Sequence, residues 1–358
     1  MNIIHIITTI DRGGAENQLI QNLLTQSKKG INVNVVFLKG NSYWRNYLID
    51  QGIKVYGPFF NKLYYFNLLG LFSLKKIINQ KKQILHCHMP PSLLVVFLIY
   101  PFIRNKNIIY TSHNDEPFIP IDIFDRLFSR FIFNKAKKII AITSTVKEFL
   151  INRYQLNPLS VDVIKYSFEP SIYINNIKSN EFDFYKKEHI YIGIVARLVT
   201  QKRIDLLIKA FKEVNKENKK IILVILGFGD KKEELLELSN NLGLSDYIIW
   251  INYSEFVIEH MQKWSLFCLT SQYEGFGLVL LEAIYAELPI VAMDVSSIKD
   301  IIGPCGETVK FGDYYSFAEK IKYVLNNKYD YLSKSYLLNF STDINFKKHL
   351  GIYNYFIN

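Results

Sequence analysis

The 358-residue chain has few cysteines, and their placement excludes a disulfide framework. Only Cys87, Cys268 and Cys305 are present, in or beside apolar runs, at spacings that match no disulfide or metal pattern. The first residues, Met-Asn-Ile-Ile-His, lack the basic segment and the cleavable apolar core of a secretory signal. These absences predict a protein of the reducing cytoplasm.

The chain also lacks a run of about 18 apolar residues, the length that a transmembrane helix requires. The longest candidate, residues 93–103, is interrupted by Pro101 and closed by Arg104. A buried helix of an α/β domain is the favoured interpretation, and a surface that dips into a bilayer is the alternative. Residues 62–76 and 126–135 mix aromatic with basic side chains. Together these stretches predict peripheral association of the first half with the cytoplasmic face of the inner membrane.

Acidic residues are fewer than basic ones, 33 against 43, which gives a net charge of +10. An excess of positive charge predicts an anionic partner such as a nucleotide, an anionic lipid surface or nucleic acid. Nucleic acid is the least favoured partner, because the aromatic and basic residues form no recognised binding module. The sequence shows no cluster of carboxylates that would hold a metal, so we expect neither a metal nor a cofactor.

Short β-branched runs alternate with helical patterns, which is typical of a parallel sheet built from βαβ units. Strands are predicted at residues 2–8, 33–38, 54–56, 84–87, 108–111, 138–142, 161–164, 190–196, 221–226, 248–251, 266–270, 290–292 and 308–310. Helices with definite bounds are predicted at residues 15–29, 204–215, 231–242, 257–262, 278–286, 315–325 and 343–356.

The alternation of strand and helix patterns fails once, at residues 165–189, and a length of 358 residues fits two domains. We therefore predict an α/β fold with two doubly wound, Rossmann-like domains at residues 1–168 and 190–340, joined by a linker at 169–189. Residues 341–358 form a C-terminal helix. Such domains bind ligands at the carboxyl ends of their strands, so the cleft between them is the expected site.

Two glutamates with seven residues between them, Glu274 and Glu282, flank a turn and the start of a predicted helix. If Gly277 lies near the helix start, free N–H groups there suit a phosphate or sugar oxygen. Eight helical residues would separate the carboxylates by about 12 Å along the axis. Glycosidase acid/base pairs are roughly 5–9.5 Å apart, so the two glutamates fit two contacts along one long ligand better.

Three loops that follow predicted strands contain candidate phosphate ligands. Arg197 and Lys202 lie where a diphosphate would be held, although two solvated cations are the plain alternative. Gly227 belongs to a Gly-x-Gly turn that tight geometry explains as well as nucleotide contact does. Gly14 opens the first helix, where α/β domains approach phosphates. The full Gly-x-Gly-x-x-Gly pattern is missing, which disfavours a dinucleotide-binding domain.

The histidines offer two further candidates. His86 and His88 would share one face of a strand, but no third ligand with metal spacing accompanies them. His113 follows a strand and begins a polar loop, where it is either simply exposed or donates a hydrogen bond to a sugar hydroxyl or a leaving phosphate.

Taken together, these motifs resemble the retaining family 4 glycosyltransferases of the GT-B fold, with the two glutamates as their E-x7-E motif. The similar segments are residues 13–16, 111–113, 196–202, 227–229, 271–292 and 306–313. The resemblance implies two Rossmann-like domains that face each other across a cleft, with the C-terminal helix packing back toward the N-terminal domain. It also implies a hexosyltransferase that uses a nucleotide-sugar donor, with UDP favoured over GDP.

The resemblance assigns a role to each motif residue. Glu274 contacts donor-sugar hydroxyls and Glu282 the ribose, while Arg197 and Lys202 neutralise the diphosphate. The amides of Phe276, Gly277 and Leu278 touch sugar and phosphates. His113 lies beside the transferred sugar, and Gly14 closes on the phosphates. Gly227 belongs to the same donor site.

The sequence departs from the family pattern at several turns. Glu287 stands where the family usually has glycine, Ser296 and Ser297 replace a glycine pair, and Asp300 replaces a glutamate. Residues 165–168 replace a Pro-Asn-Gly turn. None of these changes removes a motif glutamate or a cation.

The implied reaction is a metal-independent, retaining transfer to a saccharide acceptor, which we expect to be lipid-linked. The pathway would be that of a bacterial surface polysaccharide: O-antigen, capsule or lipopolysaccharide. Two alternatives remain open at this point. One is a non-hydrolysing nucleotide-sugar epimerase, which can share the architecture, and the other is a donor-binding scaffold protein without turnover.

Overall fold

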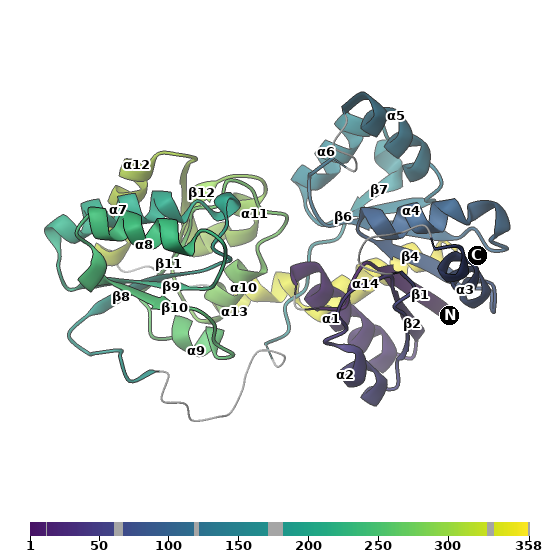
Figure 1. The fold of residues 1–358 in the computed structure, drawn as a ribbon, viewed down its shortest axis with the longest axis horizontal. Helices are drawn as coiled ribbons and strands as arrows, with labels where there is room; N and C mark the ends of the chain where they lie inside the picture. Colours follow the sequence, from purple (N-terminus) through teal and green to yellow (C-terminus); the bar gives the residue numbers. More distant parts are fainter. Residues whose placement is uncertain (12, 61–66, 118–121, 171–181, 328–332, 357–358) are drawn as a thin grey trace. The chain divides into compact units, whose positions relative to one another are not determined.

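The computed structural model describes residues 1–358 except 12, 61–66, 118–121, 171–181, 328–332 and 357–358. The chain forms two compact units, both of α/β type with an entirely parallel sheet (Figure 1). Unit 1 contains Met1–Ser167 and Phe340–Asn358, and unit 2 contains Phe168–Asn339. The boundary lies one residue before the predicted end of the first domain.

Unit 1 has a seven-stranded sheet in the order β3-β2-β1-β4-β5-β6-β7. Its strands are β1 (Asn2–Ile7), β2 (Asn32–Phe37), β3 (Lys54–Tyr56), β4 (Ile84–His88), β5 (Ile108–Ser112), β6 (Lys138–Ala141) and β7 (Val161–Val163). Its helices are α1 (Gly14–Lys28), α2 (Arg45–Asp50), α3 (Leu68–Ile78), α4 (Pro90–Leu98), α5 (Asp122–Phe133), α6 (Ser144–Tyr154) and α14 (Thr342–Asn354).

The C-terminal helix α14 belongs to unit 1 and packs against α1 (Figure 1). Ile352 and Tyr353 of α14 share one apolar core with Leu19 and Leu23 of α1 and with β1 residues such as Ile3. The core forms because β1 presents alternate side chains to this face of the sheet, while each helix presents residues three or four apart. The last residues of the chain therefore complete the core of its first domain.

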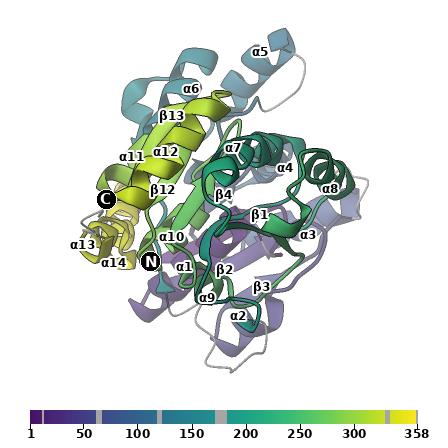
Figure 2. The ribbon, with the colours of Figure 1, turned by 90° about the vertical axis from the view of Figure 1, so that its left-hand side faces the viewer.

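Unit 2 has a six-stranded sheet in the order β10-β9-β8-β11-β12-β13. Its strands are β8 (Ile190–Val195), β9 (Ile221–Leu226), β10 (Ile248–Ile251), β11 (Leu266–Leu269), β12 (Ile290–Asp294) and β13 (Gly306–Lys310). Its helices are α7 (Ile204–Glu217), α8 (Lys232–Asn241), α9 (Val257–Met261), α10 (Leu278–Tyr285), α11 (Ile298–Ile302), α12 (Tyr314–Asn326) and α13 (Ser333–Leu337). Helices α7 and α12 pack together over the main core of this unit (Figure 2).

Every predicted strand is present within a few residues of its expected ends, because most of them are short, apolar runs that are buried on a parallel sheet. The C-terminal part of the predicted linker, residues 182–189, is not a linker. Residues 182–189 belong to unit 2, where the Tyr185 hydroxyl accepts a hydrogen bond from Trp264 Nε1 at 2.9 Å and lies 3.0 Å from His260 Nδ1. Aromatic burial fixes this segment, which lacks periodicity. Residues 171–181 of the linker lie outside the described residues.

Within residues 93–103 the structure buries one face of α4, in agreement with the favoured interpretation. Leu93, Val95 and Val96 of α4 are at most 1% exposed, whereas Phe102 in the following 3-10 turn is 61% exposed. In the described part of the chain, no helix combines the length and the apolar character needed to cross a bilayer.

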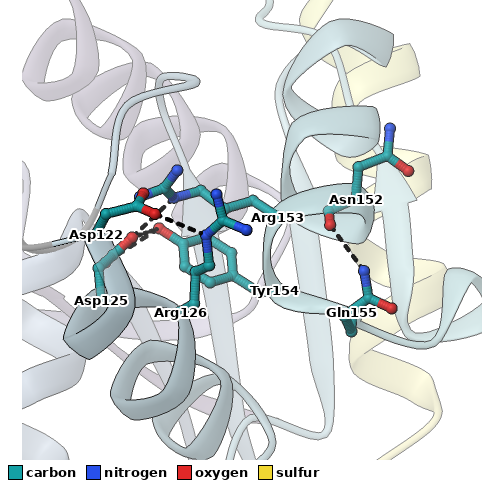
Figure 3. Close-up of polar contacts among 7 residues, drawn as sticks. All are labelled: Asp122, Asp125, Arg126, Asn152, Arg153, Tyr154 and Gln155. Atoms are coloured by element: carbon teal, nitrogen blue, oxygen red, sulfur yellow. Dashed lines mark hydrogen bonds and ion pairs between the residues drawn. The ribbon is translucent and has the colours of Figure 1, made fainter.

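A buried polar network joins α5 to α6 in unit 1 (Figure 3). Asp125 is fully buried and accepts hydrogen bonds from Arg153 Nε at 2.8 Å, Ser129 Oγ at 2.9 Å and the Tyr154 hydroxyl at 3.1 Å. Arg153 also pairs with the more exposed Asp122 at 2.8 Å. A buried carboxylate is tolerated only when its lone pairs are satisfied, so this network fixes α5 against α6.

We expect Asp125→Ala to lower the free energy of unfolding of unit 1 by about 3 kcal/mol, because it leaves a largely buried guanidinium without its main partner. The matched variant Asp122→Ala removes an exposed partner of the same arginine and should cost less than about 1 kcal/mol. Urea unfolding, followed by hydrogen exchange in α5 and α6 peptides, measures both. Equal effects of the two variants would show that burial of Asp125 does not matter.

Candidate functional site

The strand order of unit 2 reverses between β8 and β11, which lie side by side with their loops leaving the same sheet edge. Ligands of doubly wound sheets bind at such a reversal, beyond the carboxyl ends of the strands. The loop after β8 contains Arg197 and Lys202, and the loop after β11 contains Glu274. The sheet order therefore brings the predicted cations and the first motif glutamate to one edge.

Lys202 and Glu274 form an ion pair across these two loops, although they are 72 residues apart. Both side chains are largely buried, at 14% and 8% exposure. Ser271 Oγ donates a 2.6 Å hydrogen bond to Glu274 Oε1, and the Glu274 amide lies 3.5 Å from Ser296 Oγ. Because the carboxylate is held from several sides, Glu274 and Lys202 are fixed before any ligand arrives.

Hydrogen bonds to backbone carbonyls tie the same two loops together. The Gln272 amide donates to the Gln201 carbonyl at 2.8 Å, and Gln201 Nε2 donates to the Tyr273 carbonyl at 2.9 Å. Thr270 Oγ1 donates to the Lys202 carbonyl at 3.1 Å. These bonds set the position of Lys202 relative to Glu274. The backbone of the two loops therefore holds the pair together, in addition to the side-chain contact itself.

Helix α10 begins immediately after Gly277, as the sequence predicted. Gly277 has φ of 77°, a left-handed conformation that glycine adopts without strain. The N–H groups of Gly277 and Leu278 donate no hydrogen bond to other described residues, while the Phe276 side chain is buried at 3% exposure. Two amides and the positive end of the helix dipole are thus available to an anionic or hydroxyl ligand.

The 12 Å separation of the two glutamates was calculated for helix throughout, and that assumption is wrong. Glu274 to Gly277 form a non-helical turn, and only the four steps from Leu278 to Glu282 are helical. Those steps rise about 6 Å along the axis. The motif is therefore a turn followed by one helical turn, and the glutamates approach the ligand from two different kinds of backbone.

Glu282 is partly buried in α10, and no hydrogen bond to its carboxylate is found among the described residues. Burial raises the pKa of Glu282 to about 7. Near neutral pH a substantial fraction of this carboxyl group is therefore protonated. A partly protonated carboxyl can both donate a hydrogen bond to a hydroxyl group and accept one from it.

The remaining predicted residues of unit 2 differ in how they are held. Arg197 is exposed and forms no ion pair within the described part of the chain, which leaves its guanidinium available to a ligand. At Gly227, with φ of 149°, a Cβ would lie 1.8 Å from the Ala196 carbonyl oxygen. This close backbone approach explains the Gly-x-Gly turn, so Gly227 shapes the loop that carries Arg197.

In unit 1, Gly14 is the first residue of α1 and is exposed, with Gly13 at the N-cap. Glu16 in the first turn accepts a 2.6 Å hydrogen bond from Thr9 Oγ1, which ties the β1–α1 loop to the helix start. Gly14 therefore occupies a helix N-terminus that follows a strand at the β1/β4 reversal of this sheet.

His113 follows β5 and is partly buried, so it is not simply exposed. Its Nδ1 is hydrogen-bonded to the Tyr166 hydroxyl, and its Nε2 lies 3.3 Å from His88 Nδ1. Burial lowers the pKa of His113 to about 3, so its imidazole is neutral. Both ring nitrogens have protein partners, so a hydrogen bond from this ring to a sugar requires one of them to be released.

The sequence could not identify several of these partners. His5 lies beside His86 because β1 pairs with β4, so three histidines cluster where only two were expected. Nothing in the local pattern around His5 distinguishes it from an ordinary strand residue. Ser271 and Tyr166 were also missed, although both lie within or next to segments that the resemblance singled out.

Two departures from the family pattern coincide with strained backbone. Glu287 has φ of 61° and Ser296 has φ of 49°, both in the left-handed region that favours glycine. The family glycines at these places match the conformation, and this chain adopts it with larger residues. Ser296 uses its side chain near the Glu274 amide.

Comparison with known proteins gives the class of the chain. A family model described as Glycosyltransferase Family 4 matches residues 12–166, and one described as Glycosyl transferases group 1 matches residues 176–336. A structure of Anabaena HepE in complex with UDP superimposes with a TM-score of 0.83 at 17% identity, covering 99% of this chain and 100% of that one. That likeness shows the GT-B fold.

Two curated relatives are named as bacterial glycosyltransferases. A poly(ribitol-phosphate) alpha-N-acetylglucosaminyltransferase of Staphylococcus aureus is 25% identical over 82% of this chain. A Campylobacter jejuni alpha-N-acetylgalactosaminyltransferase, named for a diphospho-undecaprenol-linked acceptor, is 26% identical over 60%. The matched stretches span 60% and 58% of these relatives' own lengths.

The fold and the matched models define a glycosyltransferase built from two Rossmann-like units. More narrowly, the chain belongs to the family 4-like glycosyltransferases of the GT-B fold.

The raised pKa of Glu282 predicts a pH-dependent stability. Its folded pKa of about 7 lies above the unfolded value near 4.3, so the contribution of this group is fully present below about pH 4 and is lost as the pH rises to 7. Glu282→Gln removes this loss. We expect the variant's free energy of unfolding, relative to wild type, to increase by about 3 kcal/mol between pH 4 and pH 8.

Urea unfolding of wild type and variant at both pH values provides the measurement. The exposed Glu237→Gln on α8 serves as the matched control and should show the same difference from wild type at pH 4 and at pH 8. A Glu282→Gln difference that does not change with pH would contradict the raised pKa.

Proposed function

We propose that this chain is a retaining glycosyltransferase that moves a sugar from a nucleotide-diphosphate sugar to a saccharide acceptor. The observation that carries the proposal is the Lys202–Glu274 pair at the β8/β11 reversal, next to the free amides at the start of α10. Glu274 is the ligand for donor-sugar hydroxyls, and Glu282 is the ligand for the ribose.

The leaving diphosphate gains negative charge as the bond to the sugar breaks, and fixed positive groups lower the energy of that state. Lys202, Arg197 and the α10 amides supply such groups on one sheet edge. Lys202 is paired with Glu274 before the donor binds, so the diphosphate competes with or joins this pair. The proposal needs no divalent ion, because these groups can neutralise the departing charge themselves.

Retention of configuration follows if the acceptor hydroxyl attacks from the side that the diphosphate leaves, with a phosphate oxygen accepting its proton. The names of both curated relatives specify an alpha linkage, which is the retained product of an alpha-linked donor. The UDP in the HepE structure supports a UDP-linked donor over a GDP-linked one.

The acceptor is proposed to be a lipid-linked saccharide of a bacterial surface polysaccharide, such as O-antigen, capsule or lipopolysaccharide. The Campylobacter relative, with its diphospho-undecaprenol-linked acceptor, supports this choice. Such an acceptor places the reaction at the cytoplasmic face of the inner membrane.

Lys202→Ala is expected to reduce kcat by 10²–10³-fold, the typical cost of removing one group that stabilises transition-state charge. Lys216→Ala, an exposed lysine at the far end of α7, is the matched control and should retain full activity. A thermal-shift panel of nucleotide diphosphates selects the donor, and product formation measures turnover.

The same assay separates the alternatives. NMR of the product should show the same anomeric configuration as the donor. The yield of product should be the same with and without a chelator. An inverted product would exclude the retaining mechanism. Epimerised donor without acceptor would indicate an epimerase, and donor binding without any turnover would indicate a scaffold protein.

A surface of unit 1 fits the proposed membrane contact. We name it the α3–α5 surface; it contains exposed Leu68, Leu69 and Phe72 of α3, Phe102 after α4, and Leu127 and Phe131 of α5, each 52–80% exposed. Lys75 Nζ lies 5.7 Å from the Phe72 ring centroid and 5.2 Å from that of Phe102, while Lys135 Nζ lies 4.7 Å from that of Phe131.

Apolar side chains interleaved with lysines match the surface of an anionic bilayer. The apolar side chains would enter the boundary between headgroups and acyl chains, and the lysines would contact the anionic headgroups. The Asp125 network of Figure 3 holds α5, and with it Leu127 and Phe131, in place. Residues 62–66, part of the predicted aromatic and basic stretch, lie outside the described residues.

The double variant Lys75→Gln/Lys76→Gln should weaken binding to vesicles that contain anionic phospholipid by roughly 30-fold, given about 1 kcal/mol per lysine. Lys219→Gln/Lys220→Gln makes the same charge change on exposed residues of unit 2 and is the control. Vesicle co-sedimentation measures both. Equal loss in the two variants would point to a general charge effect, and no binding by wild type would exclude the surface.

A further inference from the structure

A continuous chain of hydrogen bonds runs through the interior of unit 1 behind His113. From Tyr166 it passes through His113 to His88, whose Nε2 lies 3.0 Å from His5 Nδ1. His5 Nε2 in turn lies 3.0 Å from Gln26 Oε1. His5, His88 and Gln26 are at most 2% exposed, so no bulk water substitutes for a missing partner.

Strand register explains this alignment. His5 of β1 is the direct partner of His86 in β4, and His88 is the partner of Thr111 in β5. Positions two apart on a strand share a face, so His5, His88 and His113 point to the same side, which α1 and α14 cover. Gln26 reaches the chain from α1.

The side-chain amide of Gln26, at the end of this series of hydrogen bonds, sets the donor-to-acceptor direction of every bond in it. Gln26 Oε1 can only accept, so His5 donates from Nε2 and its Nδ1 accepts. His88 Nε2 then donates to His5 Nδ1. His88 Nδ1 in turn accepts a hydrogen bond from His113 Nε2. The Tyr166 hydroxyl donates to the remaining Nδ1 of His113.

The groups in the chain keep the protonation states that this direction requires. Burial lowers the pKa of His5 to about 4 and that of His113 to about 3, and it lowers the pKa of His88 as well. Burial raises the pKa of Tyr166, so its phenol retains the proton that it donates. At neutral pH each imidazole is therefore neutral and carries one proton.

We propose that Tyr166 and His88 are positioning residues for His113 that, through His5 and Gln26, hold it as the Nε2–H tautomer in a single ring orientation. The inference rests on the proposed function and on the family resemblance, which implies that His113 lies beside the transferred sugar. Because both ring nitrogens are engaged and the ring is neutral, His113 shapes the sugar subsite and does not transfer a proton.

Three clustered imidazoles also resemble a metal site, but the described contacts favour the hydrogen-bonded chain. The candidate ligand atoms of His5, His86 and His88 spread over up to 4.8 Å, wider than the roughly 3.4 Å between nitrogens that lie 2.0–2.1 Å from one zinc ion. His86 has its own partners, the Tyr353 hydroxyl at 2.8 Å and Thr111 Oγ1 at 2.7 Å. Every ring nitrogen of the cluster is thus already engaged.

The test combines spectroscopy with kinetics on the full-length protein. Long-range ¹⁵N–¹H correlation spectra of histidine-labelled protein report which nitrogen of His113 carries the proton, with His113→Asn used to assign its signals. We expect one Nε2–H species in wild type. In Tyr166→Phe, which leaves Nδ1 without a donor, we expect an altered signal and a kcat lower by roughly 10- to 100-fold, with donor KM changed less.

Two substitutions of His88 separate positioning from packing. The carboxamide oxygen of His88→Asn can still accept from His113 Nε2–H, so this variant should retain kcat within about threefold. His88→Leu cannot accept, and it should lose activity as Tyr166→Phe does. Tyr154→Phe removes another buried hydroxyl of unit 1 and should leave the His113 signals unchanged. Thermal melts of all variants verify folding.

The outcomes are separable. An Nδ1–H form or a mixture of tautomers in wild type would overturn the proposal, as would stoichiometric zinc binding that shifts the His5 and His88 signals. Equal kcat in His88→Leu and His88→Asn would also refute the positioning role. If wild type transfers no sugar from any donor, the proposed function fails, while the spectra still decide whether the hydrogen-bonded chain exists.

Discussion

Parallel pairing of β8 with β11 in unit 2, and of β1 with β4 in unit 1, is the constraint on which the candidate site residues of each unit depend. At each reversal of strand order, loops from distant parts of the sequence leave the same sheet edge. In unit 2 this places Lys202 beside Glu274. In unit 1 it places His5 beside His86 and His88 and aligns them with His113.

The same constraint explains why buried charge and buried polar groups are tolerated at these edges. Lys202 and Glu274 compensate each other within loops that are tied by hydrogen bonds to backbone carbonyls. The histidines compensate one another through alternating donors and acceptors. In both units these paired groups are satisfied before a ligand binds, so a ligand meets preorganised groups and little reorganisation of them is required. Glu282 differs, since it has no hydrogen-bond partner among the described residues, and its raised pKa reflects that burial.

The strands, the start of α10 and the α/β class were predictable because each depends on local pattern. A β-branched run such as residues 221–226 has few alternatives, and a glycine before an apolar helix marks its first turn. Predictions that needed geometry beyond the neighbouring residues were less secure. The continuous helix assumed between Glu274 and Glu282 was wrong because a turn that ends at the left-handed Gly277 precedes it. Residues 182–189 looked like linker because aromatic packing on Trp264 and His260 leaves no periodic pattern.

The sequence by itself determined the α/β class, the strand positions and the motif residues, because periodicity and turn chemistry act over a few residues. Its motifs also identified the family, through short segments whose spacing is characteristic. Only the tertiary structure decided which of these residues meet. The ion pair of Lys202 with Glu274, the third histidine at His5 and the tautomer of His113 all depend on strand order and register. Those are properties of contacts between residues 25 to 83 positions apart, and no local pattern encodes them.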